Sequence, residues 1–195
     1  MNEIQLLRTQ LATERQHASA VANACVSALA DGASPVAGDS PLGQFLAASV
    51  DYLVCVLAWF EERDQRLTDL VRAWPEVPAR RALEEALARP GRSREVLERL
   101  EAACARTAAG APPAGVAGDG ARGRWQEFAQ YFNSVWSARR DAVDAVLAAS
   151  PRPADWRTVS GIDADSILEE RRRYAQVSLR LPPGTTLSAL PIAAR

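Results

Sequence analysis

Apolar residues recur every three or four positions along most of this chain, the spacing that places them on one face of an α-helix. The first stripe predicts a helix from about residue 3 to 30, interrupted where Glu14 falls on it. The second stripe begins near Pro41 and stops at Pro75, because proline cannot continue a helix. Asp64 lies on its apolar face. Two long helices, each with an acid on its apolar stripe, are therefore predicted.

Further helical stretches follow in the second half of the chain. Short helices beginning near Pro78 and Ser93 form a broken third rod. The densest aromatic face predicts a long helix over 124–149, and a last helix begins at Ser160 or Asp163. No useful strand-like alternation occurs. The pattern predicts an all-α fold, an antiparallel four-helix bundle with an extra short C-terminal helix.

The domain organisation is simple. Residues 1–178 form one helical domain, and residues 110–123, rich in Gly, Pro and Ala, are expected to be a flexible loop inside it. Residues 179–195 have no helical period and are expected to form an extended tail.

Composition narrows the functional classes. The 195 residues are 48% hydrophobic and carry a formal net charge of -1, so nothing favours binding to nucleic acid or to an anionic membrane. All 23 basic residues are arginine, which indicates a GC-rich bacterial genome and excludes a lysine Schiff base. The N-terminus lacks a signal-peptide core, and the longest apolar run, residues 53–60, is too short to span a bilayer. We expect a cytoplasmic protein.

The cysteines give no sign of a metal or disulfide framework. Cys25, Cys55 and Cys104 are far apart and odd in number, as expected of small buried residues in a reducing compartment. Cys25 lies about two helical turns from His17, too far for a hydrogen bond between nucleophile and base.

Acids on apolar stripes are the best candidates for chemistry, because a buried carboxylate must be paired, protonated or bound to a metal. Glu14 and His17 form an E-x-x-H pair on one helix face, as in metal sites inside helix bundles. With Asp64 and Asp141 they predict a carboxylate-rich site for a divalent ion such as iron or manganese.

The alternative for the same residues is structural. Glu14 would pair with an arginine of another helix, Arg139 or Arg140, and His17 would be half exposed beside it. The run from Glu169 to Arg173 is likewise expected to be a solvated helix face held by an i, i+4 ion pair.

Over roughly residues 5–156 the order of helical segments resembles that of hemerythrin-like cation-binding bundles. The resemblance rests on a helix with an inward histidine, followed by WFEERDQRLTDL and then by VWSARRDAVDAVL with ADW after it. The resemblance implies a di-iron centre held by histidines and two carboxylates, two helices carrying a histidine four residues before an acid. The acids here would be Asp64 and Asp141. Phe60 and Ser137 stand where the matching histidines would be, so the resemblance implies a metal centre that is degenerate or absent.

We therefore expect the protein to be a hemerythrin-like bundle that acts by binding or interaction rather than by catalysis. The alternatives are an iron or manganese protein that handles oxygen or peroxide, using Glu14, His17, Asp64 and Asp141, and a purely structural dimer. The broad apolar faces of the second helix and of the 124–149 helix favour a homodimer, and an unknown protein partner is a further expectation.

Overall fold

The computed structural model describes six parts of the chain: residues 2–30, 40–72, 84, 95–102, 122–133 and 152–188. The helices are α1 (Glu3–Ala30), α2 (Pro41–Arg72), α6 (Pro153–Ser160) and α7 (Ala164–Ser178), with shorter helical segments at 95–102 and 122–133. Within these parts every regular element is a helix, which confirms the predicted all-α class.

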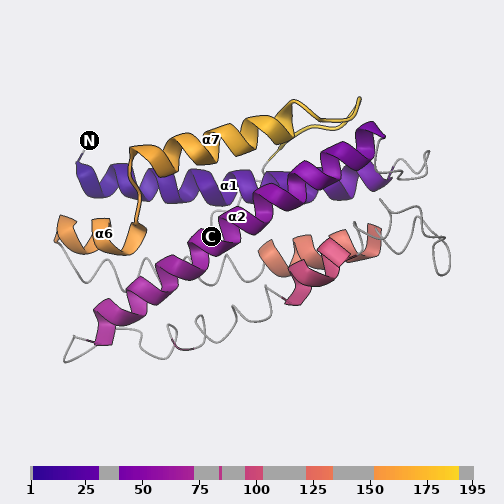
Figure 1. Ribbon diagram of the computed structural model, residues 1–195. Helices are drawn as coiled ribbons and strands as arrows, with labels where there is room; N and C mark the ends of the chain where they lie inside the picture. Colours follow the sequence, from indigo (N-terminus) through magenta and orange to yellow (C-terminus); the bar gives the residue numbers. More distant parts are fainter. Residues whose placement is uncertain are drawn as a thin grey trace.

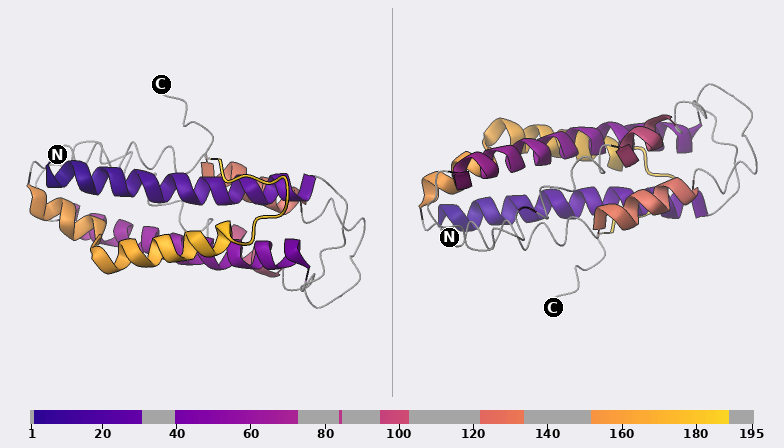
Figure 2. Two further views of the ribbon diagram at one scale, coloured as in Figure 1. Left: turned by 90° about the horizontal axis from the view of Figure 1, so that it is seen from above. Right: turned by 90° about the horizontal axis from the view of Figure 1, so that it is seen from below.

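The helices lie in two layers. α1 and α2 run in opposite directions and cross at an angle, while α7 runs alongside α1 in the same direction (Figure 1). Seen from above or below, α1 forms one layer, and α2 and α7 form the other (Figure 2). α6 lies near the start of α1 and contacts both α1 and α2. The interior polar groups discussed below lie between these layers.

The predicted apolar stripes face the main core. α1 contributes Ala18, Val21 and Cys25, and α2 contributes Phe45 and Leu53, all fully buried or nearly so. The aromatic residues expected to form a dense face also belong to this core in the described 122–133 segment, where Trp125, Phe128 and Phe132 are buried. Full burial of a side chain the size of Val, Leu or Phe contributes about 1.5–3 kcal/mol from the hydrophobic effect. Apolar burial therefore fixes which faces of α1 and α2 point inward.

A smaller apolar cluster closes the α6 end of the molecule. Trp156 and Val159 of α6 pack with Leu7 of α1 and with Leu67 and Val71 of α2. Both α6 residues lie between the predicted 124–149 helix and the predicted start of the last helix at Ser160 or Asp163, where the sequence predicted no helix. Helix α6 is thus an addition to the predicted elements.

Local signals explain where α6 and α7 begin and end. Pro153 occupies the first turn of α6, where its missing N–H is harmless, and Gly161 ends that helix with φ of 57°. Asp163, one of the two predicted starts, caps α7: its carboxylate accepts from the Ser166 N–H at 2.8 Å, and the Ser166 hydroxyl accepts from the Asp163 N–H at 3.0 Å. This cap fixes the turn between α6 and α7 and so orients α7 on α1.

Among the described helices, only α2 is long and apolar enough to cross a membrane by length and composition. Half of its most apolar window is buried against the other helices. A central core helix shows the same combination of apolar composition and burial.

Several sequence predictions concern residues outside the described parts. They include most of the short helices after Pro78, the loop up to residue 121 and the second half of the 124–149 helix. The described 122–133 helix begins two residues before the predicted 124. In the predicted tail, Leu181 and Leu187 pack against the main core.

Candidate functional site

Glu14 is buried on α1 and forms an ion pair with Arg63 of α2. Only 1% of the Glu14 side chain and 10% of the Arg63 side chain are exposed, and Arg63 Nη1 donates to Glu14 Oε2 at 2.5 Å. The amide of Gln10 approaches the other carboxylate oxygen at 3.4 Å. Two buried charges are favourable together only when their geometry and hydrogen bonds offset the loss of hydration. Arg63 supplies both the charge and the donor that Glu14 requires.

Arg63 also links α2 to α6. Its Nε donates to the backbone carbonyl oxygen of Ser160 at 2.7 Å, and its guanidinium carbon lies 5.7 Å from the centre of the Phe60 ring. One side chain therefore connects α1, α2 and α6. Glu14 does pair with an arginine of another helix, as one interpretation expected, but the partner is Arg63. Arg139 and Arg140 lie outside the described residues.

His17 contacts a second buried carboxylate, Glu170 of α7. Glu170 is completely buried, and its Oε1 lies 2.9 Å from His17 Nδ1 and accepts from the Tyr52 hydroxyl at 2.8 Å. The His17 ring, 26% exposed as a side chain, stacks on Tyr174 with centroids 3.8 Å apart. For Glu170 to accept both contacts as a carboxylate, His17 must carry a proton on Nδ1.

The surroundings of Glu170 keep the hydroxyl groups of Tyr52 and Tyr174 protonated. Burial raises the pKa of Tyr52, and the nearby Glu170 carboxylate raises it further. Burial, followed by Glu170, raises the pKa of Tyr174 in the same way. Tyr52 is therefore a fixed hydrogen-bond donor to Glu170. Burial also raises the pKa of the Cys55 thiol, so Cys55 is not an activated nucleophile.

Sequence reasoning missed Glu170 and both tyrosines. Glu170 was placed with the solvated charge run that ends at Arg173, and that expectation is wrong for Glu170, which is buried. A usable signal was present: Glu170, Tyr174 and Val177 are spaced by four and three residues, which places them on one helix face. That face contacts α1 and α2.

The predicted metal ligands fall into different environments. Glu14 pairs with Arg63, His17 contacts Glu170, and Asp64 is buried next to Arg63 in α2, 7% exposed. Within the described residues no group of three or more His, Cys, Asp or Glu side chains is placed to hold a metal ion. Asp141 lies outside the described residues, so the four-residue metal site stays a prediction.

Comparisons with known proteins leave the family open: no family model, no curated protein and no solved structure matches this chain.

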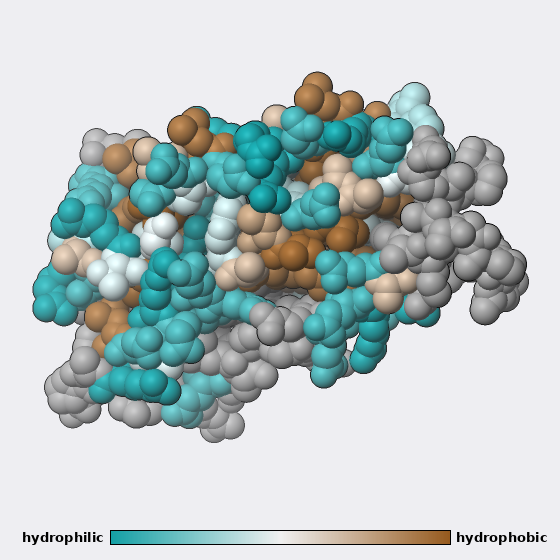
Figure 3. Space-filling view, viewed as in Figure 1, coloured by the Kyte–Doolittle hydropathy of each residue, from teal (hydrophilic) through white to brown (hydrophobic). Residues whose placement is uncertain are grey.

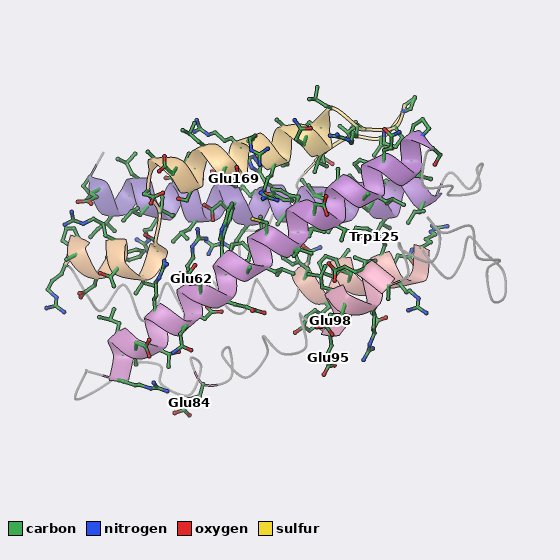
Figure 4. The ribbon with its side chains drawn as sticks, in the orientation of Figure 1. Glu62, Glu84, Glu95, Glu98, Trp125 and Glu169 are labelled. Atoms are coloured by element: carbon green, nitrogen blue, oxygen red, sulfur yellow. The ribbon has the colours of Figure 1, made fainter. Side chains whose placement is uncertain are left out.

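Helix α7 carries an arginine cluster centred on Glu169, which is labelled in Figure 4. Glu169 accepts from Nε and Nη2 of Arg172, both at 2.8 Å, and from Nε of Arg173 at 2.5 Å. The predicted i, i+4 pair of this run is therefore confirmed. The bonds from Arg172 and then Arg173 lower the pKa of Glu169 to about 2.

The low pKa of Glu169 makes the stability of the fold depend on pH in the acidic range. The folded pKa of Glu169 is below the unfolded value of about 4.3, so its contribution to stability is present above about pH 4.3 and is lost as the pH falls toward about 2. We expect the side-chain carboxyl NMR signal of Glu169 to remain largely that of the ionised form at about pH 3. In the Arg172→Gln, Arg173→Gln double variant its midpoint should rise toward the ordinary value. A midpoint near 4 in the unsubstituted chain would contradict these contacts.

Proposed function

We propose that this chain is a hemerythrin-like antiparallel four-helix bundle that works by binding, with an interior metal position that is degenerate. The observation that carries the proposal is the Glu14–Arg63 pair. Glu14 is one of the predicted metal ligands, and its buried carboxylate contacts the Arg63 guanidinium group at 2.5 Å. A positive charge already neutralises Glu14, and the same guanidinium also donates to Ser160. Glu14 is thereby stabilised in the interior without a metal ion.

Metal content tests this proposal directly. Iron and manganese are measured by plasma mass spectrometry in freshly purified protein, with Glu14→Gln and Arg63→Met as the variants. We expect amounts far below one ion per chain in the unsubstituted protein and in Glu14→Gln. Stoichiometric iron or manganese that is lost in Glu14→Gln would overturn the proposal. Glu62→Gln is the matched control, because Glu62 is an exposed acid of α2 that pairs with Arg66.

One observation favours the metal-binding alternative, an oxygen- or peroxide-handling protein. Glu170 Oε2 is buried and has no hydrogen-bond partner in the described part of the chain, although the other oxygen of that carboxylate is close to His17. A buried carboxylate oxygen and an imidazole are ligands that iron and manganese accept. Completing such a site from the predicted set would require Asp141, and the same metal measurement, repeated with Glu170→Gln, decides between the two functions.

We further propose that the protein is cytoplasmic and forms a homodimer with an additional protein partner or ligand. Sedimentation at several protein concentrations tests the dimer.

A further inference from the structure

A cavity lies between α2 and α7. Tyr52, which donates to Glu170, is part of its lining, whereas Glu14 and Arg63 are not. Its volume is about 490 Å³, and side chains from the first half of α2 and the last turns of α7 line it. A space of this size suits a small molecule. In the space-filling view hydrophilic side chains predominate along α7 (Figure 3).

Three guanidinium groups give the cavity its chemistry. Arg172, Arg173 and Arg180 line it, and Asp51 is the acidic side chain that accompanies them. Arginine presents several N–H donors in a planar arrangement that matches the oxygens of a carboxylate or phosphate. The arginines therefore favour an anionic ligand group, and Asp51 favours a hydrogen-bond donor elsewhere on the same ligand.

The arginines are held in position before any ligand arrives. Glu169 engages Nε and Nη2 of Arg172 and Nε of Arg173. Arg180 donates through Nη1 to the backbone oxygen and the side-chain oxygen of Gln176, at 2.9 and 2.7 Å. These contacts occupy only part of each guanidinium, which carries five N–H donors in all. Side chains ordered in advance lose less conformational entropy on binding.

We propose that this cavity binds a small organic oxyanion, with its carboxylate or phosphate group on Arg172, Arg173 and Arg180 and a hydroxyl or amine donor on Asp51. The inference rests on the proposed binding function and gives it a ligand class. Gln44 and Gln176, which also line the cavity, supply amide groups that can donate to or accept from the rest of the molecule.

Calorimetric titration of the full chain at constant ionic strength tests the proposal. The probes are glucose 6-phosphate and citrate, which separate a phosphate from a carboxylate ligand, with inorganic phosphate and glucose for comparison. We expect one of the two organic anions to bind more tightly than inorganic phosphate, and glucose not to bind. Arg180→Gln should weaken that binding about tenfold or more, because a charge-assisted contact is lost.

Two variants distinguish a built site from general attraction. Arg171→Gln removes an exposed arginine of the same helix that does not line the cavity, and we expect a change of less than about twofold. Asp51→Asn should weaken the organic anion but not inorganic phosphate. Arg180 lies beyond the end of α7 and is exposed, so its replacement should leave the fold intact, which circular dichroism checks.

Two results would overturn the ligand class: no binding of either organic anion below about 1 mM, or equal weakening by Arg171→Gln and Arg180→Gln. These failures differ from failure of the proposed function. Stoichiometric metal dependent on Glu14 overturns the binding function whatever the calorimetry gives, whereas a metal-free chain that ignores both anions loses only the ligand class.

Discussion

Arg63→Met is expected to lower the free energy of unfolding by about 3–5 kcal/mol, because it leaves the Glu14 carboxylate buried without its counter-charge. The variant also leaves the Ser160 carbonyl oxygen without the Arg63 donor. The physical reason is an asymmetry of buried ion pairs: the intact pair adds little net stability, but either half alone is costly. Urea unfolding followed by circular dichroism measures the change.

A matched variant and a double variant isolate the cause. Arg66→Met, in the same helix, removes an arginine that is 35% exposed and pairs with Glu62, which is 59% exposed, and it should cost less than about 1 kcal/mol. In Glu14→Leu, Arg63→Met both charges are replaced by apolar side chains, and we expect most of the lost stability to return. Equal losses for Arg63→Met and Arg66→Met would show that the Glu14 pair is not buried in solution.

Glu170→Met is expected to destabilise the fold by about 2–3 kcal/mol, because the Tyr52 hydroxyl is left buried without its acceptor. His17 loses the same acceptor, but its ring is 26% exposed and can turn toward water. Thermal or urea unfolding measures the loss. Methionine keeps roughly the length of the side chain, so the effect reports the polar contacts more than a change in volume.

The neighbouring acid provides the control for this second prediction. Glu169→Met replaces a side chain that is 34% exposed, and its unfolding midpoint should shift much less. Adding Tyr52→Phe to Glu170→Met removes the stranded hydroxyl, so the double variant should regain part of the stability. If Tyr52→Phe gives no such recovery, the buried contact between Tyr52 and Glu170 is not a main source of the effect.

Much of the fold follows from the apolar stripes, because α1 and α2 are long enough for the period to repeat many times. Their bounds agree closely with the predicted helices, and Glu14 and Asp64 are buried as their positions on those stripes indicated. Helix α6 was missed for the opposite reason. Its eight residues make about two turns, too few for a period to stand out, so Pro153 and Gly161 were its main signals.

The residues that contact the buried acids could not be predicted from the apolar stripes. Arg63 lies in the charged stretch of α2, and its inward position depends on Glu14 and on a carbonyl oxygen of Ser160 far along the chain. No local pattern encodes such a contact. Glu170 was different, because its spacing with Tyr174 and Val177 was visible, but the adjacent arginines made the whole run resemble a solvated surface.

The bridging role of Arg63 has a consequence for how the chain matures during synthesis. The first two helices emerge from the ribosome long before Ser160 and Glu170, the residues that complete the hydrogen bonds of Arg63, His17 and Tyr52. Until those residues are translated, the nascent α1–α2 hairpin holds polar interior groups with unfilled contacts. A chain stopped before residue 153 should therefore remain loosely packed, because the polar contacts that residues 153–195 normally supply would be missing, and it should depend on chaperones until they are made.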